Sequence, residues 1–391
     1  MTYRAHWSFV TLILYITMGL LCAWCCHRAK KMVLSIGQKR SLFSKEYWPW
    51  YFVWIILAVF RYVDNEVGGT DAPNYIRYFE NCLNMHGLDQ TDILFKWFNQ
   101  MIRIVFEDYH WFFLIFYGFT LVAMVLFINE FARAKASSIP LCILVFLYIR
   151  SFTSIRSNLA LSVLLIALVL LKRKKVVLSV IVAISSFFIH VMSAVYIAFF
   201  AFYFLYHNRK ISFWKSVVLV IAAYAVALVG QKFIMSGGIS YLAETGTGVY
   251  ASYAGKTVGA TIAEMLNVSY IPQIILFVAC MIFRKDYDKE ILLSKPEEQE
   301  QLKMLRNICY FDFFAVPVIM ILGIYRGYEF FYLPRLVMWG ELLTIIKKKF
   351  TKDSRVFVMV FAMFIFILWM YGRIEATWES SHLMPYIFWG L

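Results

Sequence analysis

Residues 147–175, LYIRSFTSIRSNLALSVLLIALVLLKRKK, decide the fold class, because a long apolar run ends in four consecutive basic residues. Similar runs recur along the 391-residue chain, which is 62% hydrophobic and only 16% charged. In lipid, only helices and closed barrels satisfy the backbone, and barrel strands alternate polar and apolar residues. These runs do not alternate. The sequence therefore predicts an all-α, polytopic integral membrane protein.

The apolar runs predict about twelve transmembrane helices within a single membrane domain, 1–391. Their ranges are 7–26, 47–62, 111–129, 139–149, 157–171, 176–190, 191–206, 212–230, 266–283, 308–324, 330–346 and 356–372. Two of them, 139–149 and 157–171, are short for a membrane span of about 20 residues. The continuous run 176–206 is too long for one ordinary span and too short for two.

Basic residues are unevenly shared between the two sets of loops that alternate along these helices. One set holds 25 of the 38 Lys and Arg residues, in 27–46, 130–138, 172–175, 207–211, 284–307 and 347–355. The other set holds 10. The positive-inside rule makes the first set cytoplasmic, and it places both termini and segments 63–110 and 231–265 outside. The net charge of +14 follows this orientation, so we expect no nucleic-acid partner.

Three long segments between the apolar runs have distinct characters. In 63–110, Gly68, Gly69 and Pro73 mark a turn, and the later stretch DILFKWFNQMIRIVFEDYHW predicts an amphipathic helix at the membrane surface. Segment 231–265 is rich in Gly, Ser, Thr and Tyr, which favours a flexible loop and a candidate lid. Cytoplasmic segment 284–307 mixes both signs of charge and predicts a solvated amphipathic helix.

Two arginines, Arg150 and Arg156, bracket the short turn between two predicted helices. Arg156 falls where a helix begins, and a cation there faces the positive end of the helix dipole, which is unfavourable until an anion binds. Backbone N–H groups and a guanidinium can then converge on one phosphate. The alternative for Arg156 is a structural ion pair with Asp64 or Asp71. The alternative for Arg150 is that it snorkels to the outer interface.

Other titratable residues are predicted at the same outer face. Asp71 lies in a turn flanked by Gly and Pro, where it is either a reactive carboxylate or the cap of the following helix. His190 interrupts the run 176–206, either as a satisfied core histidine or as an active group. Arg326 lies in a short outer loop. Arg335 lies inside an apolar run, where an arginine is a functional candidate.

No motif of a soluble enzyme is present, because the sequence lacks a P-loop and the patterns G-x-S-x-G, H-E-x-x-H and GxGxxG. The seven cysteines lie mostly within apolar runs, without the second pair or the histidines of a zinc site. The outer loops also lack a D-x-D pair that would hold a metal on a nucleotide sugar. We therefore expect no metal and no cofactor, and a reaction in which arginines neutralise a diphosphate leaving group.

Several short segments share the motifs of a known family. They are GGTDAPNYIRYFE after the second helix, SIRSNLALSVLLIALVLLKRKK followed by SFFIHVMSAV, the outer turn YRGYEFFYLPRL and the terminal PYIF. In these segments the chain resembles the EpsG-like proteins, which are Wzy-type polymerases of bacterial surface polysaccharides. Asp71, Tyr75, Arg156 and His190 match the family motifs. The resemblance implies a membrane-embedded, inverting glycosyltransferase with GT-C-type architecture.

The resemblance also implies a substrate and a location. We expect a polymerase that joins oligosaccharide repeat units carried on undecaprenyl diphosphate, at the outer face of the bacterial cytoplasmic (inner) membrane. Donor and acceptor are then both lipid-linked glycans, and the other expected partners are the bilayer, a chain-length regulator and a flippase. The product belongs to the O-antigen, capsule or exopolysaccharide class, and the sugars and their linkage are not given by the resemblance.

Each candidate residue has an expected role in this reaction. Arg156 and Arg150, with Arg326 or Arg335, are expected to bind the donor diphosphate and to stabilise its departure. Asp71 is the first choice for the base that accepts the proton of the attacking hydroxyl, and His190 is the second. Asp64 and Tyr75 complete the expected substrate-binding set.

Two other functions remain open. A ligase that transfers a lipid-linked glycan would share the arginines and the outer site but would use a different acceptor. A flippase or exporter would carry charged residues through the depth of the membrane, in paired halves. Here the charged candidates gather at one predicted face and no repeat is detectable, which favours an enzyme.

Overall fold

The computed structural model describes residues 2–36, 44–83, 93–133, 138–206, 213–233, 271–321, 329–349, 352–376 and 381–388. Within these ranges the regular secondary structure is helical, and one isolated bridge pairs Arg61 with Phe388. This result confirms the all-α fold class. Each of the twelve predicted apolar segments overlaps a helix, while the number of membrane crossings remains a prediction. Arg326 and most of the candidate lid 231–265 lie outside the described residues.

Three helices of the described part are long and apolar enough to cross a membrane. They are Phe9–Ala29 near the N-terminus, Tyr109–Phe131 and Ile155–Lys172, and several shorter apolar helices accompany them. The shorter helices expose large apolar side chains, such as Val177 at 75% and Trp214 at 74%. A soluble protein rarely exposes apolar side chains in such numbers, whereas lipid accepts them. The chain is therefore a helical membrane protein.

The chain folds into two compact units, here called unit 1 and unit 2. Unit 1 comprises Met1–Met85, Ile93–His190 and Leu336–Leu391. Its helices are α1 (Thr2–Ile36), α2 (Trp48–Val59), α3 (Ala72–Asn81), α4 (Ile93–Val105), α5 (Tyr109–Phe131), α6 (Leu144–Arg150), α7 (Ile155–Lys172), α8 (Val176–Phe187), most of α16 (Tyr332–Lys349) and α17 (Lys352–Ala376), with 3-10 turns η1 (Lys45–Tyr47) and η3 (Pro140–Ile143).

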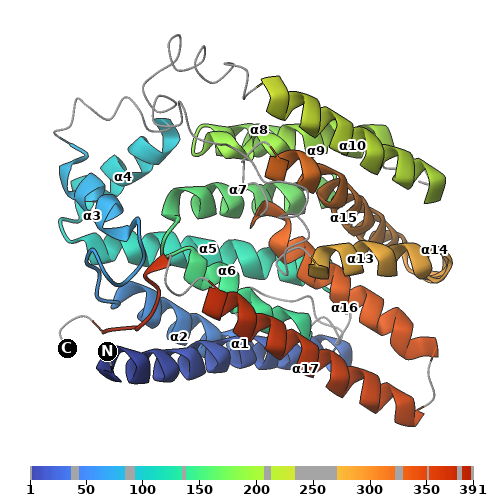
Figure 1. Ribbon diagram of the computed structural model, residues 1–391, viewed down its shortest axis with the longest axis horizontal. Coiled ribbons are helices and arrows are strands. Elements are labelled where there is room, and N and C mark those ends of the chain that lie inside the picture. Colours follow the sequence, from blue (N-terminus) through green and yellow to red (C-terminus); the bar gives the residue numbers. More distant parts are fainter. Residues whose placement is uncertain are drawn as a thin grey trace. The chain divides into compact units, whose positions relative to one another are not determined.

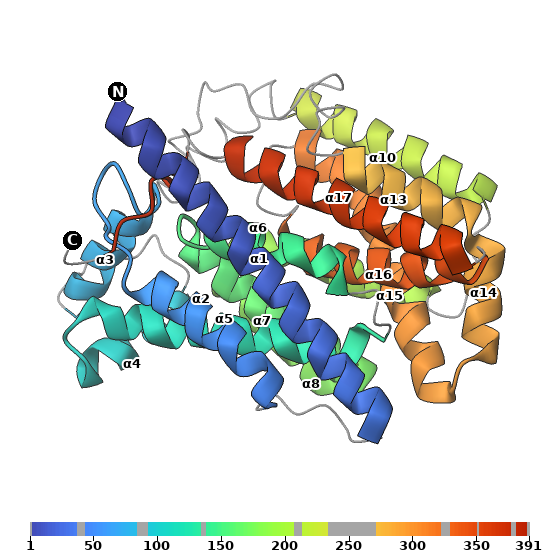
Figure 2. The same cartoon turned by 90° about the horizontal axis from the view of Figure 1, so that it is seen from below.

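The long helices of unit 1 pack in series. Helix α2 packs on α5, α5 on α7 and α7 on α8, so that these four lie side by side (Figure 1). Helix α1 packs against α2, α6 and α17, and the view from below shows α1 as the long helix that begins at the N-terminus (Figure 2). The two predicted short segments become η3 with α6, and α7, joined by the turn 151–154.

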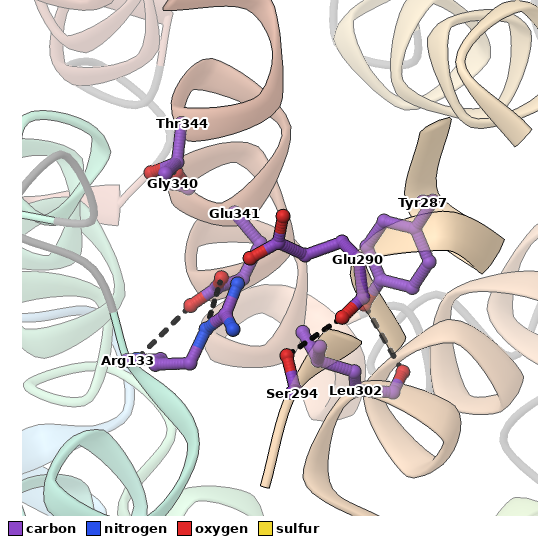
Figure 3. Close-up of polar contacts among 8 residues, drawn as sticks. All are labelled: Arg133, Tyr287, Glu290, Ser294, Leu302, Gly340, Glu341 and Thr344. Carbon is purple, nitrogen blue, oxygen red and sulfur yellow. Dashed lines mark hydrogen bonds and ion pairs between the residues drawn. The ribbon is translucent and has the colours of Figure 1, made fainter. Parts of the chain in front are cut away.

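Unit 2 comprises His86–Asp92 and Val191–Arg335. Its helices are η4 (Val191–Ala194), α9 (Val195–Tyr206), α10 (Phe213–Phe233), α13 (Ile271–Ile282), α14 (Arg284–Leu293) and α15 (Pro296–Ile321). Helix α15 contacts α9, α10, α13 and α14, and is the centre of this unit. Segment 284–307 forms α14 and the start of α15, where Tyr287 donates to the carbonyl of Leu302 at 3.0 Å (Figure 3).

The two ends of unit 1 carry the loops that are predicted outside and in the cytoplasm. At one end α2 and α6 finish and α5 and α7 begin, and Figure 1 shows α3, α4, the start of α1 and the tail 381–388 gathered there. At the opposite end the Glu341 carboxylate accepts hydrogen bonds from the backbone N and Nε of Arg133, at 3.0 and 3.4 Å (Figure 3). Glu130 similarly pairs with Lys172 at 2.9 Å and with Arg173.

Candidate functional site

Three segments that are far apart in the sequence meet at Gly69, in the end of unit 1 that is predicted to face outside. The backbone N of Gly69 donates to the carbonyl of His382 at 3.0 Å, and that of Thr70 donates to the carbonyl of Ser381 at 3.1 Å. On its other side Gly69 approaches the backbone of Phe152, in the turn between α6 and α7. We call this meeting of loop 61–71, turn 151–154 and tail 381–388 the Gly69 junction.

Glycine is required at position 69 for two reasons. Its φ of +113° is a conformation that residues with a side chain rarely adopt. A Cβ at this position would lie only 2.5 Å from the carbonyl oxygen of Phe152. Because the obstructing atom belongs to the backbone, the loop and the turn can accommodate a side chain only by separating.

We expect Gly69→Ala to lower the stability of the protein by at least about 1–3 kcal/mol, the usual cost of a strained backbone conformation. Gly118→Ala is the matched control, because Gly118 lies in α5 with nothing within 4 Å of a Cβ there. In a helix that change is neutral or stabilising by up to about 1 kcal/mol. Thermal unfolding in detergent compares the two variants. Equal stability of Gly69→Ala and wild type would contradict the close packing at this junction.

Arg61 holds the loop of the junction in place. Its guanidinium donates to the carbonyl of Gly68 at 3.1 Å, to the hydroxyl of Tyr117 at 3.0 Å and to the carbonyl of Ala58. Its Cζ lies over three aromatic rings, 4.2, 5.1 and 4.4 Å from the centroids of Phe113, Tyr117 and Phe152. The side chain is 1% exposed. An arginine within an apolar run is thus explained by ring contacts and hydrogen bonds that fix the loop.

The two predicted aspartates lie on this loop with different surroundings. The carboxylate of Asp64 accepts hydrogen bonds from the backbone N of Glu66 and Val67, at 2.7 and 2.8 Å, and so shapes the turn before Gly68. Asp71 occupies the N-cap position of α3, but its carboxylate makes no capping hydrogen bond. Asp71 is partly exposed. The position of Asp71 in the sequence allows it to cap α3, but its side chain does not form the capping hydrogen bond.

Tyr75 lies one turn beyond Asp71 on α3, on the side of the helix that packs against α4. The rings of Tyr75 and Tyr78 contact Phe95 of α4, at centroid distances of 5.8 and 5.5 Å. Both tyrosines remain partly exposed. Helix α4 is the amphipathic helix predicted in segment 63–110, and it supports the predicted substrate-binding tyrosine.

Arg150 and Arg156 lie at facing helix ends on either side of the turn 151–154. Arg150 is the last residue of α6, and its carbonyl accepts a hydrogen bond from the hydroxyl of Thr153 at 2.9 Å. Arg156 is the second residue of α7, as predicted, and the N-cap Ser154 makes no side-chain cap there. Both arginines are partly exposed. Because Gly69 contacts this turn, the arginines and Asp71 belong to connected segments of one unit.

His190 ends the part of unit 1 that precedes unit 2. It is buried, at 4% exposure, and its backbone N donates to the carbonyl of Ser186 at 2.9 Å. The end of α8 is tied to the start of α4, because the backbone N of Leu94 donates to the carbonyl of Phe188 at 3.0 Å. His190 is therefore placed near the start of α4.

Arg335 belongs to unit 2 and is engaged in a buried ion pair. Its Nε and Nη2 donate to the two carboxylate oxygens of Asp312 on α15, at 2.5 and 2.8 Å. Gln273 of α13 donates to the same carboxylate at 2.8 Å. Arg335 and Asp312 are 3% and 1% exposed. Asp312 was missed by sequence reasoning, although a lone acidic residue in the predicted helix 308–324 was the signal that could have found it.

The described part of the chain shows no evident metal-binding site. Among those residues, no group of three or more His, Cys, Asp or Glu side chains is arranged to hold a metal ion. The expectation that the reaction uses arginines in place of a metal remains a prediction.

Comparison with known proteins identifies one family. The sequence model of the EpsG family matches residues 47–388, which is most of the chain and includes α3, the Arg150–Arg156 turn and the tail 381–388. No curated protein and no solved structure matches the chain significantly.

Proposed function

Because the chain belongs to the EpsG family of Wzy-like polysaccharide polymerases, we propose that it joins lipid-linked repeat units at the Gly69 junction. The donor is the growing glycan on undecaprenyl diphosphate, and the acceptor is the next lipid-linked unit. The reaction takes place on the outer face of the cytoplasmic membrane, in a GT-C-type glycosyltransferase that inverts the anomeric configuration.

The Gly69 junction is the observation that supports this proposal. It connects the loop that carries Asp71 to the turn 151–154, which Arg150 and Arg156 flank. A polymerase needs a proton acceptor for the attacking hydroxyl and a cationic site for the departing diphosphate. The connected segments supply the carboxylate of Asp71 and the guanidinium groups of Arg150 and Arg156 for these two tasks.

The chemistry divides between these residues. The sugar hydroxyl of the acceptor attacks the anomeric carbon of the donor, the bond from that carbon to the diphosphate oxygen breaks, and the hydroxyl proton passes to a base. Asp71 takes this proton, with His190 as the second candidate. Arg156 and Arg150 stabilise the charge that develops on the diphosphate, and Asp64 and Tyr75 line the glycan site.

Analysis of surface glycan from a deletion strain tests the function. Loss of the polymerase leaves glycan of a single repeat unit, and the intact gene restores long chains. A strain that lacks surface glycan altogether would indicate a flippase, and unattached polymer of normal length would indicate a ligase.

We expect polymerisation by the purified protein to continue in EDTA at the rate seen without chelator. Arginines can neutralise a diphosphate through paired charge-assisted hydrogen bonds, without a divalent ion. The assay follows chain length on lipid-linked repeat units, with and without EDTA. Loss of activity that Mg²⁺ or Mn²⁺ restores would refute the metal-independent mechanism.

Labelling of single cysteines tests the proposed orientation. All seven native cysteines are buried, so the wild-type protein supplies a low background for an impermeant thiol reagent. A cysteine at the exposed Asn65 is expected to react in intact spheroplasts, whereas one at Leu292, which is 76% exposed on α14, is expected to react only in inverted vesicles. The reverse pattern would place the junction on the cytoplasmic side.

A further inference from the structure

The tail 381–388 is bound to three other parts of unit 1. The hydroxyl of Tyr15 on α1 donates to the carbonyl of Leu383 at 2.8 Å, and the hydroxyl of Tyr386 donates to the carbonyl of Leu57 on α2 at 2.7 Å. Next to these contacts, Ser381 and His382 accept the hydrogen bonds from Thr70 and Gly69 described above. The tail is therefore part of the junction, and it brings the imidazole of His382 there.

His382 has a backbone conformation that favours a different residue. Its φ is +52°, in the left-handed region, which costs a residue with a side chain roughly 1 kcal/mol relative to glycine. Only the carbonyl of His382 is used in the bond to Gly69, and glycine supplies the same carbonyl. A strained conformation retained beside a candidate site points to a use for the side chain.

The imidazole itself gives a second, independent observation. Its Nδ1 is buried and has no hydrogen-bond partner among the described residues, while the residue as a whole is partly exposed. A desolvated polar atom without a partner is costly, and such atoms call for an explanation in function or in bound ligand. A ligand that hydrogen bonds to this nitrogen after a rotation of the partly exposed ring would offset the cost of the unpaired atom.

We propose that His382 is a further substrate-binding residue, whose imidazole hydrogen bonds to a sugar hydroxyl of the lipid-linked glycan. This inference rests on the function proposed above. A sugar hydroxyl suits an imidazole because each group both donates and accepts a hydrogen bond. In the proposed function, the arginines that flank the neighbouring turn bind the diphosphate. The tail is therefore expected to contact the other part of the substrate, which is the glycan.

The test measures binding of two probes to purified full-length variants in detergent. The probes are the undecaprenyl-diphosphate-linked repeat unit and undecaprenyl diphosphate without sugar. His382→Gly keeps the carbonyl and relieves the backbone but removes the ring. His382→Asn tolerates positive φ and retains a polar atom near the position of Nδ1. Lys174→Gly is the matched control, because Lys174 also has positive φ, at +61°, in the turn between α7 and α8.

We expect His382→Gly to raise the Kd for the glycan-bearing probe about 3- to 10-fold, the range for one neutral hydrogen bond. His382→Asn should bind it more tightly than the glycine variant does, Lys174→Gly should match wild type, and the sugar-free probe should bind equally to all. Wild-type affinity in His382→Gly would overturn the proposal. So would an equal loss for both probes, an asparagine variant no better than glycine, or a wild type that binds neither probe. A wild type that binds the unit without polymerising it would instead count against the proposed function.

Discussion

Replacing Arg156 by alanine or lysine is expected to reduce turnover by about 10- to 150-fold for each diphosphate hydrogen bond that is lost, while the protein stays inserted and folded. This range corresponds to about 1.5–3 kcal/mol for a hydrogen bond to a charged group. Arg156 is thus the residue whose loss should slow the reaction most.

The position of Arg156 explains why lysine is not expected to replace it. As the second residue of α7, it stands beside the first backbone N–H groups of the helix, which have no partner within the helix. The guanidinium of arginine adds further N–H donors in a planar, forked arrangement that fits a diphosphate, whereas the ammonium of lysine acts as a point charge. Removing a cation from the positive end of the helix dipole should leave the stability of the substrate-free protein unchanged or slightly raised.

Two measurements on one preparation decide the role of Arg156. Thermal unfolding in detergent gives the stability, and polymerisation of the lipid-linked unit gives turnover per folded molecule. Arg77→Ala is the control, because Arg77 is exposed on the polar face of α3, where it donates to the side chain of Asn74. If Arg156 instead forms a buried pair with Asp64 or Asp71, its alanine variant should lose several kcal/mol of stability and retain its turnover.

Asp312→Ala is expected to destabilise the protein by about 3–5 kcal/mol, the cost of leaving one member of a buried ion pair without its counter-charge. The change removes the carboxylate to which the guanidinium of Arg335 and the amide of Gln273 both donate hydrogen bonds. Removing both charges is a different experiment, because a buried pair can often be replaced by apolar side chains without loss. The double variant Asp312→Leu/Arg335→Leu should therefore be more stable than Asp312→Ala.

Asp288→Ala is the matched control for this stability measurement. Asp288 pairs with Arg306 at 2.8 Å, but the two side chains are 24% and 12% exposed. A more exposed pair contributes about 1 kcal/mol or less. If Asp312→Ala is no less stable than Asp288→Ala, the buried pair does not stabilise unit 2 as expected.

The sequence predicted the helices and the loops that carry the candidate site, because both depend on local pattern. Apolar runs of sufficient length specify helices in lipid, and Gly68, Gly69 and Pro73 specify the turn that precedes α3. The same local reasoning placed Arg156 at the start of α7, where the structure has it. The break of segment 284–307 into α14 and α15 at Ser294 was missed, although Pro296 marks it.

The partners within the site depend on contacts between distant residues, which a local pattern does not contain. Tyr15 and Leu383 are 368 positions apart, and Tyr386 and Leu57 are 329 positions apart. The ring contacts of Arg61 likewise require that α2, α5 and the turn 151–154 be already packed. The sequence alone does not reveal these contacts. It therefore does not distinguish an arginine that supports a loop from an arginine that binds a substrate.

The position of the tail also affects biogenesis. Residues 381–388 are the last described part of the chain to leave the ribosome, and they hydrogen bond to residues made more than 300 positions earlier. Until they arrive, Gly69 and Thr70 lack the carbonyls to which they donate. A nascent chain still being inserted therefore holds an incomplete junction. Under the function proposed above, a copy whose synthesis has not reached the tail is therefore expected to be inactive in glycan transfer.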